Sequence, residues 1–181
     1  MNLWSQNMEN NNFTGNSNQM IDFLGNRWNF DCLGCAIVKG EVQIPGGIIY
    51  EGKHAILGAD PEIPIPGFLI INVKRHIYSF SQLNKEERNE IGNLITYAEK
   101  ALRELKIVDE VTLVQEERSK HLHIWIFPNY DWMAEKFGKG ISYLREIAEY
   151  AKNNHNEENS RKVLEVIENI KEYLKKHNIT E

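Results

Sequence analysis

The chain has 181 residues, of which 41% are hydrophobic and 26% are charged. This length supports one sizeable core and is short for two independent domains. The formal net charge of −5 excludes a broad basic surface for duplex nucleic acid or an anionic membrane, although a local basic pocket can still bind a small anion. The sequence has no secretory signal pattern and no apolar run near the roughly 18 residues that a membrane span needs, so we expect a cytoplasmic protein.

The first elements in chain order are a polar N-terminal segment and several short strands. Residues 1–26 are rich in Asn, Ser, Gln and Gly and are expected to be poorly structured, so the folded domain should begin near residue 27. Residues 48–51 and 54–58 have the pattern of a β-hairpin. Three prolines then indicate a stiff loop over 59–67, and the apolar run 68–73 predicts a buried strand.

The clearest helix signal follows Asn84, which has the capping-box spacing with Glu87 and precedes apolar residues at helical intervals up to Leu105. Residues 111–115 and 120–128 predict a second hairpin. Two amphipathic helices are expected near 141–153 and 156–177, packed on the domain or a second subunit, with recognition of a partner as the alternative. This order predicts an α+β domain with an antiparallel sheet over residues 27–131 and a C-terminal helical extension over 132–181.

The most informative segment is the predicted strand at 120–128, which carries two histidines. Because strand side chains alternate, His121, His123 and Trp125 should project on one face, opposite an apolar face. Imidazole suits acid–base, nucleophilic and metal-binding chemistry near neutral pH. The alternative is a half-exposed sheet face with two histidines and no catalytic function.

Cys32 and Cys35 form a Cys-x-x-Cys pair, which in a protein without a secretory signal indicates a metal or redox site. A redox role is less well supported, because no helical pattern begins at Cys32. A tetrahedral zinc site would need two further ligands. The candidates are four histidines outside the polar terminal helices: His54, His76, His121 and His123. Spacing alone does not decide whether the two strand histidines share one metal or serve different sites.

The segment 121–127 resembles the motif His-φ-His-φ-His-φ-φ of the histidine triad (HIT) superfamily, where φ is apolar and Trp125 replaces the third histidine. The segment 67–77, which includes His76, and the cysteine pair resemble its zinc-bearing bacterial members. The similarity covers about residues 32–130. It implies a HIT-like antiparallel sheet with one covering helix and a homodimer. It also implies a structural zinc ion held by Cys32, Cys35, His76 and His121.

The resemblance further implies a nucleotide hydrolase or nucleotidyltransferase, whose partner is a nucleotide or nucleotidyl conjugate. His123 would attack the α-phosphate and form a covalent nucleotidyl-histidine. The residues expected to bind substrate are Gln115, Ser119, Lys120 and Trp125, although a solvated turn explains Ser119 and Lys120 equally well. Because an indole cannot shuttle protons, Trp125 leaves a non-catalytic nucleotide-binding or scaffolding protein as an alternative. A third alternative is a catalytic zinc site that uses both His121 and His123.

Overall fold

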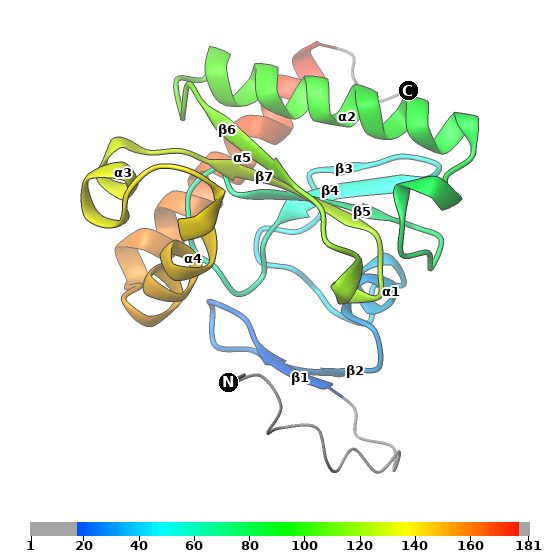
Figure 1. Ribbon diagram of the computed structural model, residues 1–181, viewed down its shortest axis with the longest axis horizontal. Coiled ribbons are helices and arrows are strands. Elements are labelled where there is room, and N and C mark those ends of the chain that lie inside the picture. The colour runs from blue at the N-terminus through cyan, green and yellow to red at the C-terminus, as the bar shows by residue number, and fades with distance from the viewer. Residues whose placement is uncertain (1–17, 178–181) are drawn as a thin grey trace, which may run out of the picture.

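A computed structural model describes residues 18–177 and contains a five-stranded antiparallel sheet with the strand order β3-β4-β5-β7-β6 (Figure 1). The strands are β3 (Tyr50–Glu51), β4 (Ala55–Ala59), β5 (Leu69–Val73), β7 (His123–Pro128) and β6 (Val111–Val114). Each neighbouring pair is antiparallel. The predicted α+β class and both predicted hairpins are therefore confirmed. Among the described residues, no helix has the length and apolar character needed to span a bilayer.

One face of the sheet is covered by two helices, α2 (Lys85–Glu104) and α5 (Glu157–Lys176). Helix α2 begins as the sequence predicts, because the Asn84 side chain accepts from the Glu87 amide and the Glu87 carboxylate accepts from the Asn84 amide. Apolar residues of α5 join the same core, so this predicted C-terminal amphipathic helix packs on the domain beside the one helix predicted to cover the sheet. This core contains Leu69, Ile71 and Val73 of β5, Ile124 and Ile126 of β7, and Val163, Ile167, Ile170 and Leu174 of α5.

The opposite face is covered at both ends and not in the middle. At the β4 end, Ile56 packs with Met20 and Ile37 from the N-terminal part of the chain. At the β7 end, Phe127 packs with Ile147 of the C-terminal extension. The covering elements are β1 (Asn18–Ile21), β2 (Arg27–Phe30) and α1 (Leu33–Val38) at one end, and α3 (Asp131–Phe137) and α4 (Leu144–Asn153) at the other (Figure 1). Between these two ends, Ile70 and Asn72 of β5 and His123 and Trp125 of β7 line a pocket.

Some elements differ from the sequence-based expectations. Of the segment expected to be poorly structured, residues 1–17 lie outside the described part of the chain, but residues 18–21 form β1, which pairs with β2. The ordered structure thus begins before residue 27, because Met20 and Phe23 are buried against the rest of the fold. Helices α1 and α3 were not predicted. Residues 18–177 also contain three short 3₁₀ helices: η1 (Phe80–Gln82), η2 (Glu117–Ser119) and η3 (Ile141–Tyr143).

Candidate functional site

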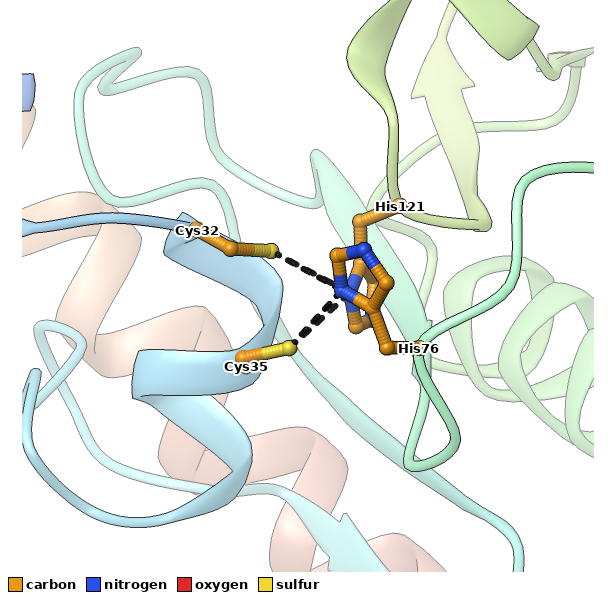
Figure 2. Close-up of side chains that lie close together, drawn as sticks. All are labelled: Cys32, Cys35, His76 and His121. Carbon is orange, nitrogen blue, oxygen red and sulfur yellow. Dashed lines mark hydrogen bonds between the residues drawn. The ribbon is translucent and has the colours of Figure 1, made fainter.

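Four side chains from three distant parts of the chain meet in one cluster (Figure 2). Cys32 is the N-cap residue of α1, and Cys35 lies one turn further along the same helix. Three-residue spacing on a helix directs both sulfur atoms to one side. His76 lies three residues after β5, and His121 lies two residues before the start of β7. The two Sγ atoms and the two Nδ1 atoms all lie within 4.8 Å of one another.

The distances between these atoms fit a tetrahedral zinc ion. Zn–S bonds of about 2.3 Å and Zn–N bonds of about 2.0–2.1 Å at tetrahedral angles place sulfur and nitrogen about 3.5 Å apart and the two nitrogens about 3.3 Å apart. Cys32 Sγ lies 3.5 Å from His76 Nδ1 and 3.4 Å from His121 Nδ1. Cys35 Sγ lies 3.0 and 3.6 Å from the same two atoms, which are 3.4 Å apart. The site is therefore a candidate zinc site of the Cys₂His₂ type.

His121 is oriented for metal binding by its second ring nitrogen. Its Nε2 donates to the Val73 carbonyl oxygen at 2.9 Å, which leaves the lone pair on Nδ1, toward the cysteines. Burial and the nearby His76 and His123 lower the pKa of His121, which favours the neutral form that binds metal. Gly34 allows the close approach to α1, because a Cβ at this position would overlap the His121 ring.

In this cluster, a bound cation would have its largest effect on the protonation of the cysteine thiols. Burial and then the neighbouring Cys32 raise the pKa of the Cys35 thiol. A coordinated divalent cation stabilises the thiolate form and therefore lowers the pKa of the thiol. The donor set therefore fits zinc in chemistry as well as in geometry.

His123 is not part of this cluster, whose four potential ligands within the described residues are the two cysteines, His76 and His121. Its Nδ1 donates to the main-chain carbonyl of His121 at 3.0 Å. Its Nε2 has no hydrogen-bond partner in the described part of the chain, so a neutral ring carries its lone pair there. Burial lowers the pKa of His123, although the carbonyl contact and Glu116 act in the opposite direction. Separation from the cluster argues against a zinc site shared by His121 and His123.

His123 lines a pocket of about 500 Å³ between the sheet and the N-terminal elements. Two buried polar residues that sequence reasoning missed also line it. Asn72 lies directly opposite His123 in the β5–β7 register, and it is the only polar residue in the apolar run 68–73. Asp60 immediately follows β4, and its Oδ1 accepts from the amides of Glu62 and Ile63, both at 2.8 Å. Burial raises the pKa of Asp60 to about 6.

The predicted substrate-binding residues lie around His123 but not all on one side. Lys120 lines the same pocket as Asp60, whereas Gln115 lines a second pocket beyond His123. Ser119 lines both pockets, and its hydroxyl lies 2.8 Å from the His121 carbonyl oxygen and 3.0 Å from that of Glu116. A hydroxyl has one proton, so Ser119 would have to give up a main-chain contact to donate to a ligand.

Trp125 also lines both pockets, two residues beyond His123 on β7. Its ring packs edge-on against Phe68 with centroids 5.2 Å apart and stacks with Phe127 at 6.4 Å. It therefore belongs to the apolar cluster that the C-terminal extension covers. The side chain at the third motif position is thus held by packing and supplies no proton donor or acceptor other than its indole N–H.

Comparison with solved structures identifies the fold. A hypothetical histidine triad nucleotide-binding protein from Sulfolobus tokodaii matches 80% of this chain and 94% of its own, with 17% identity and a TM-score of 0.57. A zinc-bound histidine triad family protein from Mycobacterium smegmatis matches 78% of this chain and 96% of its own, with 17% identity and a TM-score of 0.54. A HIT family protein from Bacillus anthracis matches 77% of this chain and 96% of its own, with 20% identity and a TM-score of 0.52.

These similarities show that the chain has the histidine triad fold, with a Cys₂His₂ cluster that can hold zinc. No model of a known protein family matches the sequence. At identities this low, structural similarity establishes the fold and leaves the activity to be argued from the site.

Proposed function

We propose that the protein is a nucleotide hydrolase or nucleotidyltransferase in which His123 attacks the α-phosphate of a nucleotide or nucleotidyl conjugate. The observation that carries the proposal is the hydrogen bond from His123 Nδ1 to the His121 carbonyl. It fixes the tautomer and leaves a nucleophilic Nε2 on a residue that lines the pocket. The Sulfolobus tokodaii neighbour, described as a nucleotide-binding protein, supports the substrate class.

The reaction would proceed in two transfers. His123 Nε2 forms a bond to the α-phosphorus while the bond to the leaving group breaks, and water or another acceptor then releases the nucleotide. Charge on the phosphate oxygens needs nearby donors. Gln115, Ser119 and Lys120 are the proposed donors, and Trp125 is the proposed wall beside the reacting phosphate. Asn72 joins this set, because it lies directly opposite His123 on the adjacent strand β5 and lines the same pocket.

Zinc would be structural in this scheme. Cys32, Cys35, His76 and His121 would hold it, as the donor distances and the zinc-bound neighbour support. The ion would link α1, the end of β5 and the start of β7, and so fix the position of His121. Since the His121 carbonyl orients His123, the metal supports the nucleophile without contacting it.

Two histidine variants test this division. His123→Ala should reduce nucleotide turnover to background and leave the zinc content unchanged, whereas His121→Ala should lose zinc. His155→Ala is the matched control, because His155 is exposed, lies outside both pockets beside His123, and hydrogen-bonds to the Lys152 carbonyl. Turnover by His123→Ala equal to that of the unchanged chain would refute the proposal. Loss of zinc in His123→Ala would instead support a shared metal site.

A non-catalytic nucleotide-binding or scaffolding protein is the second candidate, and Trp125 at the third motif position is the observation that favours it. Tight nucleotide binding without turnover, together with activity gained in Trp125→His, would support this candidate. The homodimer stays a prediction that light scattering of the purified chain can test.

A further inference from the structure

One wall of the first pocket is the segment 60–66, which lies between β4 and β5 and whose first four residues line the pocket. Three prolines remove backbone donors from this pocket wall, and its own hydrogen bonds are local. Asp60 Oδ1 accepts from the amides of Glu62 and Ile63. The Ile65 amide donates to the Ile63 carbonyl oxygen at 2.9 Å. These bonds fix the shape of the pocket wall, so contacts with other elements are needed to fix its position.

The C-terminal extension supplies both apolar and polar contacts to the pocket wall. Ile65 is buried in the apolar cluster that contains Ile147 of α4, and Ile63 packs against the same cluster. The hydroxyl of Tyr130, the residue before α3, donates to the main chain of the wall at 2.8 Å. On the N-terminal side, the Phe23 amide donates to the main chain of the wall at 2.9 Å. The position of the wall therefore depends on α3 and α4 as well as on the strands that it connects.

Lys152, in the last turn of α4, adds a charged contact to the pocket wall. Its Nζ donates to Glu62 Oε1 at 2.6 Å. Glu62 lines the first pocket, whereas Lys152 lines neither pocket beside the proposed nucleophile and so is not placed to touch a ligand there. Burial is the main reason that the pKa of Asp60 is raised, and Glu62 adds to this effect while Lys152 opposes it. Lys152 thus offsets the repulsion between two carboxylates in one wall.

We infer that α4 holds the pocket wall in place and that Lys152 is a positioning residue for substrate binding, which acts through Glu62. The inference rests on the proposed function, because it takes the first pocket as the place where the nucleotide binds. The ion pair is partly exposed, with 42% of the Lys152 side chain and 34% of the Glu62 side chain accessible to solvent. Ion pairs of this kind add little to the stability of a fold. Loss of the pair should therefore shift the wall without unfolding the domain.

Turnover of ATP by the full chain tests the inference. Lys152→Met removes the charge and keeps an unbranched side chain. It should raise KM about threefold and change kcat by less than about twofold, since a partly exposed ion pair corresponds to a small factor in an equilibrium constant. Lys152→Arg keeps the charge and should restore the KM of the unchanged protein. Lys162→Met is the matched control, because Lys162 forms an ion pair with Glu158 at 2.7 Å and lies outside both pockets.

A double-mutant cycle tests whether Lys152 acts through Glu62. In a Glu62→Gln background, Lys152→Met should cause no further increase in KM, because the partner of the lysine is already neutral. Three results would overturn the inference and leave the role of His123 intact. They are an unchanged KM in Lys152→Met, a lower kcat at constant KM, and the same increase in KM in both backgrounds.

Hydrogen exchange measured by mass spectrometry gives a readout without a nucleotide. The amides of Glu62, Ile63 and Ile65 should exchange faster in Lys152→Met than in Lys162→Met, while exchange in α2 should be equal in the two variants. Equal exchange in the pocket wall would overturn the inference. Absence of both turnover and binding of ATP, GTP, CTP and UTP by the unchanged protein would instead overturn the proposed function, and with it the role of Lys152 in substrate binding.

Discussion

The carbonyl oxygen of His121 accepts a hydrogen bond from Nδ1 of His123 at 3.0 Å, so the main chain of one histidine orients the side chain of the other. The imidazole of His121 faces the two cysteines, and its own Nε2 donates to Val73. Metal binding and the proposed nucleophile are thus separate in their side chains and joined through one peptide group.

Gly34→Ala should weaken zinc binding although it changes no ligand. The added methyl group would overlap the His121 ring, so the ring or α1 must shift. Competition with a chromophoric chelator should show a lower zinc affinity and thermal unfolding a lower Tm. Gly92→Ala is the matched control, because a Cβ there meets nothing within 4 Å and alanine stabilises a helix interior by about 1 kcal/mol. Equal zinc affinity in both variants would contradict the proposed contact.

Removal of zinc should destabilise the fold, because the metal would link elements more than 40 residues apart in sequence, as the separation of 44 residues between Cys32 and His76 shows. We expect about one zinc per chain by elemental analysis and a lower Tm after chelation. Cys35→Ser should reproduce the effect without chelator. Zinc content that is unchanged in Cys35→Ser would rule out this cluster as the binding site.

Glu87 should contribute stability that is lost in acid. Its carboxylate accepts from Arg75 Nε and Nη2 and from the Asn84 amide, and the Arg75 contact is the main reason that its pKa falls to about 2 from 4.5. A lowered pKa means that the folded state binds the proton less readily than the unfolded state. This stability is therefore present above pH 4.5 and decreases between pH 4.5 and about 2. Denaturant unfolding should show a steeper decrease for the unchanged protein than for Glu87→Gln over this range.

Asp60 should have the opposite dependence. Its burial raises its pKa from 3.8 to about 6, so its unfavourable contribution is absent below pH 3.8, grows as pH rises from 3.8 to about 6, and is complete above 6. Asp60→Asn, which keeps an acceptor for the Glu62 and Ile63 amides, should be more stable above pH 6, by at most about 3 kcal/mol. The two proteins should converge near pH 4. If Asp60→Asn is less stable than the unchanged protein at pH 8, the carboxylate stabilises the pocket and this prediction is wrong.

Elements with a long or strongly patterned sequence could be predicted. Helix α2 has its own cap and an apolar stripe, and the alternation around His123 separates a core face from a pocket face. Helix α1 could not be predicted, because it has six residues and Cys32 makes no side-chain capping bond. Strand β1 lies in a polar segment, and its structure depends on Met20 packing against distant residues.

The site could also be predicted only in part, because some of its residues come together only through tertiary packing. The proposed ligands are marked by residue type, and Asn72 was marked by its polarity within an apolar strand. The second pocket has no local signal, because Gln115 and Arg145 meet only when α4 packs beside the η2 turn. Such a pocket follows from tertiary packing, which no short pattern encodes.

The most direct test of the account is the covalent state of His123 during reaction with a nucleotide. Protein mixed with ATP and quenched rapidly in alkali, where phosphohistidine bonds persist, should gain the mass of one adenylyl group, which is AMP less water, and peptide mapping should locate it on His123. The adduct should be absent from His123→Ala, which should retain its zinc. Turnover with no adduct, or an adduct on another residue, would contradict the central claim.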